Sequence, residues 1–153
     1  MTNYVKNKPR PLINLENMRP VAITEKLPDI ERLKEEFTTP QTGAVVVFEG
    51  KPRNDNGISA LHYEVYDQMA LKELQKIREE ILQTYPVLEV LIYHRKGVVK
   101  VGETSFVVVV FAKHRKEAFE ACSRAVDEVK KRAPIWKREV YTDGTFGEWI
   151  LGI

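Results

Sequence analysis

The sequence predicts an α+β fold in one domain, and three observations support this prediction. The chain has 153 residues, a length that suits one domain with a single core. Two segments repeat apolar side chains at three- and four-residue steps, as amphipathic helices do, whereas others are β-branched and apolar, as buried strands are. From residue 58 onwards these elements follow the order β-α-β-β-α-β, the split βαβ order of an α+β sandwich.

The first 42 residues contribute little to this pattern. Four prolines and the lack of a sustained periodicity predict an irregular N-terminal arm over residues 1–28. The folded domain is then expected to cover residues 29–153. It begins with a short amphipathic helix that is capped by Asp29 and ends near Phe37.

The strands are predicted from their β-branched and aromatic content and from the glycines that bound them. Residues 43–50 indicate a buried strand, followed by a polar loop at 51–57 and a second strand at about 58–66. Further strands are expected at about 87–95 and 104–113. A final hairpin is predicted from strands at 135–141 and 146–151, joined over Thr142–Thr145.

Two helices separate these strands. The apolar stripe of the first consists of Leu71, Leu74, Ile77, Ile81 and Tyr85, and Pro86 ends it. The apolar stripe of the second consists of Phe119, Cys122, Val126 and Val129, and Pro134 ends it. We expect both amphipathic helices to pack their apolar stripes against the sheet.

Composition excludes several classes of protein. Hydrophobic residues at 43% and charged residues at 30% are typical of a globular chain. The 24 Lys and Arg against 22 Asp and Glu give a net charge of +2, too balanced for binding polyanions through bulk charge. A single cysteine, Cys122, excludes a disulfide framework within the chain and indicates a reducing compartment. The longest apolar run, 106–112, is too short to span a membrane, and the N-terminus does not resemble a signal peptide, so we expect a cytoplasmic protein.

The usual cofactor and metal motifs are missing from the sequence. It has no dinucleotide-binding or phosphate-binding glycine loop and no zinc-protease motif. His62, His94 and His114 are scattered without ligand spacing, so no metal site is expected. Cys122 belongs to the apolar stripe of its helix, which favours a small buried hydrophobic residue over a reactive thiol.

Clustered cations are the notable polar feature. Residues 113–116 (Lys-His-Arg-Lys) join a strong strand to the second helix, and residues 130–138 run from the end of that helix into the next strand. Arg53 lies in the polar loop. Solvated surface charge, or complementation of the helix dipole, would explain each cation taken alone.

A helical wheel separates the cations at the end of the second helix. At 100° per residue from Phe119, Lys130 lies at about +20°, at the edge of the apolar stripe, whereas Lys131 and Arg132 point away from it. We therefore expect Lys130 to lean toward the sheet and Lys131 and Arg132 toward water. Lys137 follows on the next strand, so two lysines are expected to converge at a proline-containing corner and form a small-anion site.

Several segments, in this order, resemble the catalytic (large) subunit of molybdopterin synthase. They are Gly43–Arg53 (GAVVVFEGKPR), Leu61–Tyr66 (LHYEVY) with Met69 and Ala70, His94–Gly97 (HRKG), Val101–Glu103 (VGE), His114 and Arg115 with Ala118–Ala121 (AFEA), and Lys130 with Arg132–Glu139 (RAPIWKRE). Together they cover about residues 43–149. The resemblance implies an α/β hammerhead-like fold with an extra small antiparallel β element.

The resemblance also implies an activity. In this family, a small ubiquitin-like sulfur-carrier subunit presents a thiocarboxylate on its C-terminal Gly-Gly. The large subunit transfers two sulfurs onto cyclic pyranopterin monophosphate and forms the dithiolene of molybdopterin. A homodimer of large subunits forms the centre of a heterotetramer, and neither a metal nor an organic cofactor is required.

By motif, the resemblance assigns Lys130 and Lys137 as catalytic residues. It assigns the substrate pocket to these two lysines with Arg53, His114, Arg115 and Arg138, flanked by Lys51 and Glu139. Arginine forks and lysine ammonium groups suit a phosphate-bearing substrate.

Arg115 and Lys130 are 15 residues apart on one predicted helix, so roughly 22 Å separates their backbones. One phosphate-sized pocket does not bridge that distance easily. If both serve one site, we expect His114 and Arg115 to come from a second subunit of a C₂ homodimer.

A nucleic-acid-binding module of split βαβ type is the alternative. It would need aromatic side chains exposed on central strands as stacking platforms. The central strand at 106–112 reads instead as core.

Overall fold

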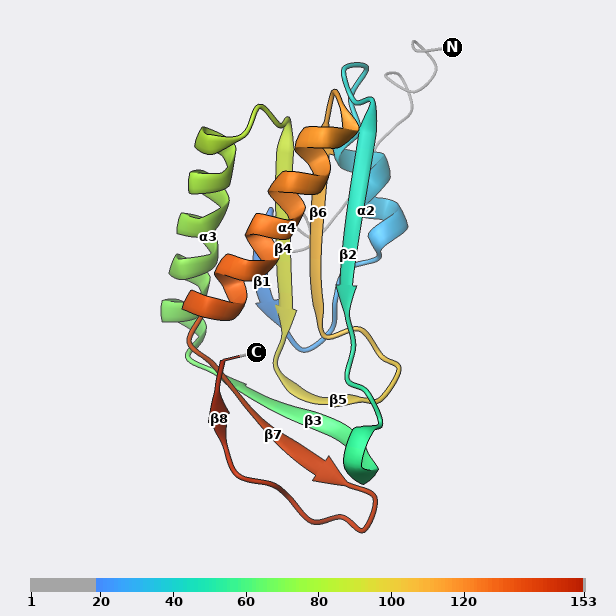
Figure 1. Ribbon diagram of the computed structural model, residues 1–153, viewed down its shortest axis with the longest axis vertical. Coiled ribbons are helices and arrows are strands. Elements are labelled where there is room, and N and C mark those ends of the chain that lie inside the picture. The colour runs from blue at the N-terminus through green and yellow to red at the C-terminus, as the bar shows by residue number, and fades with distance from the viewer. Residues whose placement is uncertain (1–18, 153) are drawn as a thin grey trace.

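The chain forms two four-stranded β-sheets and three α-helices in a computed structural model that describes residues 19–152 (Figure 1). The helices are α2 (Ile30–Phe37), α3 (Asp67–Thr84) and α4 (Arg115–Arg132), with a short 3₁₀ turn, η2 (Asp55–Gly57). The strands are β1 (Val21–Thr24), β2 (Ala44–Gly50), β3 (Ile58–Val65), β4 (Glu89–Arg95), β5 (Gly97–Lys100), β6 (Phe106–Ala112), β7 (Ile135–Tyr141) and β8 (Ile150–Leu151).

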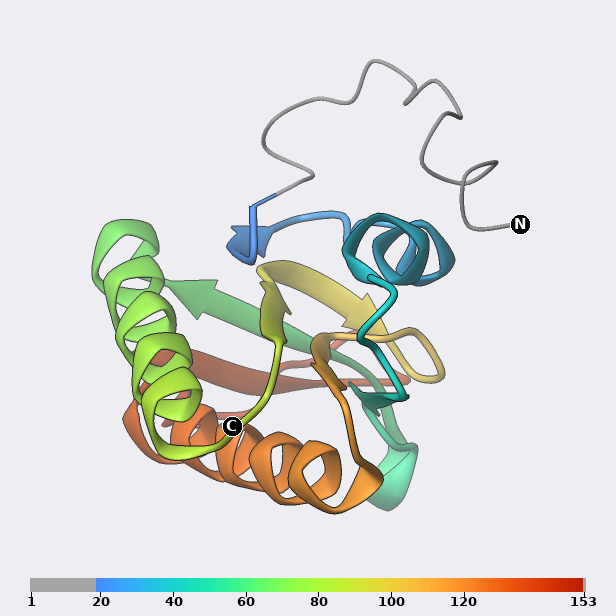
Figure 2. The ribbon, with the colours of Figure 1, turned by 90° about the horizontal axis from the view of Figure 1, so that it is seen from above.

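The first sheet, ordered β1-β4-β6-β2, contains most of the core. β6 pairs antiparallel with β2 and with β4, and each of its seven residues is buried. Helices α3 and α4 cover one face of this sheet and α2 covers the other, as the view from above shows (Figure 2). Because β6 is buried throughout, it exposes no aromatic ring on which a nucleic-acid base could stack.

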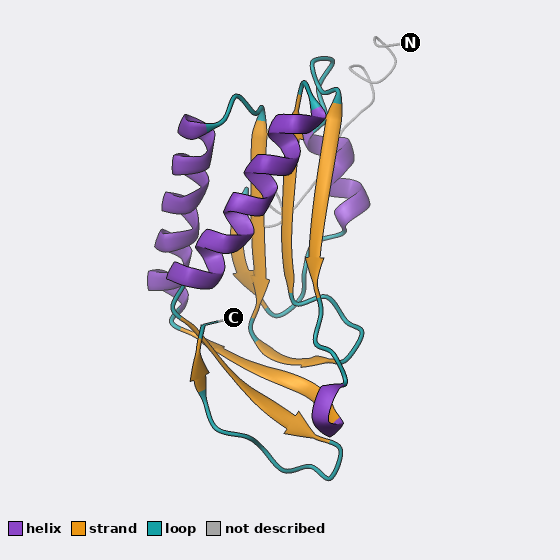
Figure 3. Cartoon of the chain, in the orientation of Figure 1, coloured by secondary structure: helices purple, strands orange, loops and turns teal. Residues whose placement is uncertain are grey.

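The second sheet, ordered β5-β3-β7-β8, lies beyond the ends of the strands of the first (Figure 3). β3 pairs antiparallel with β5 and β7, and β7 pairs with β8 only at Trp136 and Lys137. This sheet is the small antiparallel element expected beside the split βαβ unit. The predicted α+β fold of one domain is confirmed.

Two predicted segments differ at the ends of the chain. Within the arm expected at residues 1–28, Val21–Thr24 form strand β1, which pairs in parallel with β4. Four residues are too few for a readable periodicity, and burial of Val21 against the core holds the strand in place; residues 1–18 lie outside the described residues. The last hairpin is shorter than predicted, because only β8 and a single bridge between Val140 and Phe146 face β7.

The apolar stripe predicted for α4 is displaced around the helix. The buried residues are Ala118, Ala121, Cys122, Ala125 and Val129. Phe119, the reference point of the helical wheel, is 60% exposed. Three alanines allow α4 to pack closely on β2 and β6, and alanine carries little weight in a hydrophobic pattern, so the predicted stripe missed them.

This displacement gives α4 two distinct flanks, one on each side of its buried face. The inner flank carries Glu128 and Arg132 and faces α3. The outer flank carries Arg115, Phe119, Ser123, Val126 and Lys130, all within roughly 60° of Phe119 around the helix axis. The two cations at the ends of the outer flank, Arg115 and Lys130, are among the residues that the family resemblance assigns to the site.

Candidate functional site

The corner between α4 and β7 carries Lys130 on its helix side and Lys137 on its strand side. Ala133 ends the helix, with its backbone N–H donating to the Val129 carbonyl, and β7 begins two residues later at the buried Ile135. The C-terminal segment joins both sides of the corner. Ile150 pairs with Lys137, and Gly152 donates to the Ile135 carbonyl beside the Lys130 backbone.

The two lysines of this corner differ in solvent exposure, and neither has a hydrogen-bond or ion-pair partner among the described residues. Lys130 is exposed and Lys137 is partly buried. Within residues 19–152, neither ammonium group makes a hydrogen bond or an ion pair with another residue. Lys130 is solvent-facing, so the prediction that it leans on the sheet is wrong. The small-anion site expected at this corner stays a prediction.

Strand alternation separates Arg138 from Lys137. Successive side chains of a strand point to opposite faces, and Lys137 shares its face with the buried Ile135. Arg138 lies on the other face, where its guanidinium donates to His62 at 3.2 Å and stacks 3.9 Å from the ring centroid of Phe146. Glu139 returns to the face of Lys137 and hydrogen-bonds Tyr141, which raises the pKa of that phenol.

The loop after β2 contains Lys51 and Arg53. The ammonium of Lys51 donates to Thr104 at 2.8 Å, and the exposed Arg53 forms an ion pair with Asp55 at 3.1 Å. Asp55 lies just before the start of β3, whereas Lys137 pairs with Tyr63 further along that strand. Tyr63 is five residues beyond Ile58, which corresponds to roughly 17 Å of strand, so this loop is distant from the lysine corner.

His114 and Arg115 lie at the other end of α4. His114 is the N-cap residue, but its side chain makes no capping hydrogen bond. Both side chains are exposed, and neither has a hydrogen bond or ion pair among residues 19–152. The 18-residue helix separates them from Lys130, so one chain by itself does not bring the predicted site residues together.

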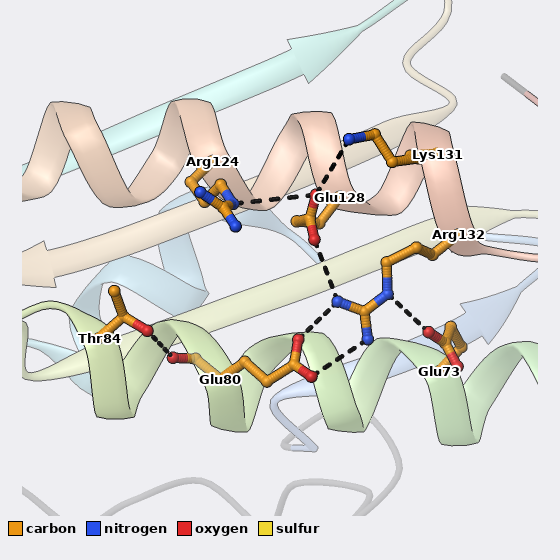
Figure 4. Close-up of polar contacts among 7 residues, drawn as sticks. All are labelled: Glu73, Glu80, Thr84, Arg124, Glu128, Lys131 and Arg132. Atoms are coloured by element: carbon orange, nitrogen blue, oxygen red, sulfur yellow. Dashed lines mark hydrogen bonds and ion pairs between the residues drawn. The ribbon is translucent and has the colours of Figure 1, made fainter.

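Arg132 is the residue whose surroundings the sequence did not predict. Instead of pointing into water, its guanidinium is largely enclosed and contacts carboxylates of α3 and α4 (Figure 4). The signal was available, because the buried alanines of α4 would have placed Arg132 only about 40° from the centre of the buried face.

Other candidate groups contribute no catalytic site. A surface pocket of about 640 Å³ includes Trp136 and Trp149, but Trp136 points to the opposite face of β7 from Lys137. Burial raises the pKa of the Cys122 thiol to about 11, which makes it a poor nucleophile at neutral pH. Within residues 19–152, no cluster of His, Cys, Asp and Glu could hold a metal ion. No helix in that range is long and apolar enough to cross a membrane.

Comparison with protein families gives a match over most of the domain. The MoaE protein family matches residues 23–132, a range that includes Lys51, Arg53, His114, Arg115 and Lys130. A molybdopterin synthase catalytic subunit from Pyrococcus abyssi is 54% identical over 114 residues, covering 72% of this chain and 76% of the relative. One from Thermoplasma volcanium is 39% identical over 132 residues, covering 84% of this chain and 96% of the relative.

Solved structures resemble the fold as well. Molybdopterin synthase from Staphylococcus aureus superposes with a TM-score of 0.80 at 32% identity, covering 87% of this chain and 98% of that one. A complex of subunits 1 and 2 of the molybdopterin-converting factor of Helicobacter pylori contains a chain that matches with a TM-score of 0.71 at 26% identity. That alignment covers 87% of this chain and 90% of the other.

Proposed function

Because the chain belongs to the MoaE family of molybdopterin synthase catalytic subunits, we propose that it catalyses the sulfur transfer that completes molybdopterin. The sulfur donor is the C-terminal thiocarboxylate of a small ubiquitin-like subunit, and the acceptor is cyclic pyranopterin monophosphate. The observation that supports this proposal is a corner that carries Lys130 on its helix side and Lys137 on its strand side, neither with a hydrogen-bond or ion-pair partner among residues 19–152.

The charge of this corner suits both reactants. A thiocarboxylate and a phosphate are anions, and each ammonium group offers three donors and a localised positive charge. Breaking the bond between the acyl carbon and sulfur develops negative charge on the acyl oxygen, which a fixed cation stabilises. An extended Gly-Gly tail is expected to bring its terminus beside Lys130, because glycine permits the backbone to approach closely.

A second copy of the chain supplies the remaining cations in this proposal. Arg115 and Lys130 end the same outer flank of α4, and Ser123 lies midway between them. If two α4 helices pack antiparallel about a two-fold axis near Ser123, Arg115 of each copy lies opposite Lys130 of the other. The exposed Phe119 and the partly buried Val126 would then provide apolar contact along the flank.

This helix arrangement makes a prediction about cross-linking. Packed helices have axes about 8–10 Å apart, so facing residues near a two-fold axis reach disulfide distance. Ser123→Cys in a Cys122→Ala background should form a disulfide-linked dimer under mild oxidation. Glu120→Cys, one turn away on the exposed side of α4, is the matched control and should remain largely monomeric on a non-reducing gel.

The function itself is tested by reconstitution. The purified chain is mixed with a thiocarboxylated ubiquitin-like subunit and cyclic pyranopterin monophosphate, and the dithiolene product is measured. Product should form with the thiocarboxylate and not with the same subunit ending in a carboxylate. Absence of product in both reactions, with a relative's catalytic subunit active in parallel, would exclude sulfur transfer by this chain.

A further inference from the structure

Arg132 connects the last turn of α4 to α3 through three carboxylates. Its Nε donates to Glu73 at 2.8 Å, and its Nη1 donates to Glu128 at 3.1 Å. Both terminal nitrogens donate to the carboxylate of Glu80. Figure 4 shows the guanidinium between the two helices, with Glu73 and Glu80 on either side of it along α3.

Burial distinguishes this arginine from the lysine beside it. The side chain of Arg132 is 22% exposed, whereas that of Lys131 is 75% exposed and approaches Glu128 only at 4.0 Å. The hydrogen bond with Glu80 is the main cause that raises the pKa of Arg132, and the same bond lowers the pKa of Glu80. A planar fork with several donors is needed to bind three carboxylates at once, and an ammonium group cannot reproduce it.

The anchored turn is also the one that presents Lys130. Only Lys131 separates the two residues, and the chain turns at Ala133 into the strand of Lys137. The last turn of a helix has unpaired carbonyls and frays readily unless other contacts hold it. The contacts of Arg132 with Glu73 and Glu80 therefore fix the direction in which the root of Lys130 leaves the helix.

Arg132 also partly neutralises the three carboxylates that surround it. With the arginine present, its guanidinium is hydrogen-bonded to Glu73, Glu80 and Glu128 on the inner flank. Without it, the cations closest to Glu128 would be Arg124 at 3.8 Å and Lys131 at 4.0 Å, and Glu128 of α4 would face Glu73 and Glu80 of α3 with no guanidinium between them. Repulsion among these carboxylates would weaken the hold of α3 on the last turn of α4, the turn from which Lys130 leaves the helix.

We propose that Arg132 is a positioning residue for Lys130: it holds the last turn of α4 on α3 and thereby fixes where Lys130 leaves the helix. This inference rests on the proposed function of Lys130. It assigns Arg132 no contact with substrate. The fold does not depend on Arg132 alone, because the same corner also contains the buried side chains of Val129, Ala133 and Ile135.

The test compares Arg132→Gln and Arg132→Lys with Lys131→Gln, a control that removes one positive charge from the same turn. Steady-state sulfur transfer gives kcat and KM for the pterin, and hydrogen exchange reports the amides of the last turn of α4. For Arg132→Gln we expect kcat to fall about tenfold to a hundredfold, KM to stay within about threefold, and exchange in the last turn to accelerate while β6 stays protected. Arg132→Lys should be intermediate, and Lys131→Gln should match the wild type.

Three results would overturn the proposal. They are a wild-type kcat for Arg132→Gln, an equal loss of kcat in Lys131→Gln, or a rise in KM that accounts for the whole loss. If Arg132→Gln does not fold, Arg132→Lys decides in the same way, since a wild-type kcat there excludes a need for the fork. A wild-type chain that transfers no sulfur would contradict the proposed function instead, and hydrogen exchange would still decide whether Arg132 holds this turn.

Discussion

The two flanks of α4 carry similar numbers of charges but use them in opposite ways. On the inner flank, Arg132 binds Glu128 and the two carboxylates of α3, so it is paired within the chain. On the outer flank, Arg115 and Lys130 have no partner among residues 19–152, and the exposed Phe119 lies between them. One flank is therefore complete, whereas the other presents groups that a further molecule can engage.

This difference explains why a charge-rich helix end is a poor indicator of function by itself. Lys130, Lys131 and Arg132 are consecutive cations that would all complement the helix dipole. Their roles diverge because 100° of rotation per residue directs each one to different surroundings. In our proposal, the inner flank holds the helix in position and the outer flank binds substrate and a second copy of the chain.

The largest effect is expected from removing the ammonium groups of the corner. Lys130→Ala and Lys137→Ala should each lower sulfur transfer by about a hundredfold or more, since a fixed charge near the reacting group is lost. For Lys130→Ala the free energy of unfolding should change by less than about 0.5 kcal/mol, because the side chain is exposed. Activity assays and urea unfolding measure the two quantities.

A large loss of stability in Lys130→Ala would contradict this comparison. It would mean that Lys130 supports the fold in the way proposed for Arg132, and the two flanks would not differ as described.

The apolar centre of the outer flank can be disrupted separately. Phe119→Asp places a charge on a side chain that is 60% exposed in the single chain, so the fold should persist while the helix-to-helix contact is lost. We expect a monomer by analytical ultracentrifugation and a loss of sulfur transfer close to that of Lys130→Ala. Glu120→Gln, one residue away, should leave the dimer intact. A Phe119→Asp variant that remains dimeric would place the interface elsewhere.

Much of this fold was predictable because its signals are local. The stripe of Leu74, Ile77 and Ile81 predicts α3, and the run from Phe106 to Ala112 predicts the buried strand β6. Strand β1 was not predicted, because its stability comes from pairing with β4 rather than from its own four residues.

The site was predictable only in part. Helical geometry predicted that Lys130 and Lys137 converge at one corner, and the structure places Lys137 opposite Ile150 and the Lys130 carbonyl beside Gly152. The orientation of α4 was wrong because Phe119 was weighted more heavily than Ala118, Ala121 and Ala125, which form the buried face. The same error placed Arg132 on the wrong side of the helix. Its partners on α3 also gave no local signal, because they are more than 50 residues away in sequence.

A buried titratable group should affect stability without involving either flank. Burial among Tyr63 and Phe106 lowers the pKa of His94 to about 4, although its Nδ1 donates to the Arg95 carbonyl. The unfolded chain binds this proton near pH 6.5, so stability falls as the pH drops from about 6.5 toward 4. Between pH 7.5 and 5.5 the loss should be about 1 kcal/mol.

Urea unfolding at the two pH values measures this loss. His94→Asn keeps a donor near the Arg95 carbonyl and should flatten the pH dependence, even though the variant is less stable at both values. An equally steep dependence in His94→Asn would assign it to other groups.

The smallest effect is expected at Lys131. Its side chain is 75% exposed and its nearest carboxylate oxygen, on Glu128, is 4.0 Å away. Lys131→Ala should therefore keep both sulfur transfer and the free energy of unfolding near the wild-type values. A loss comparable to that of Lys130→Ala would show that both flanks, and the exposed side between them, contribute to the site.

The composite site is tested most directly by mixing two inactive variants. Arg115→Ala and Lys130→Ala chains are combined in equal amounts, allowed to exchange subunits, and assayed for sulfur transfer. About half of the dimers are then mixed, and each should hold one intact site of two, so activity should recover to about a quarter of the wild-type rate. If verified mixed dimers recover no activity, Arg115 and Lys130 do not act together across the two subunits.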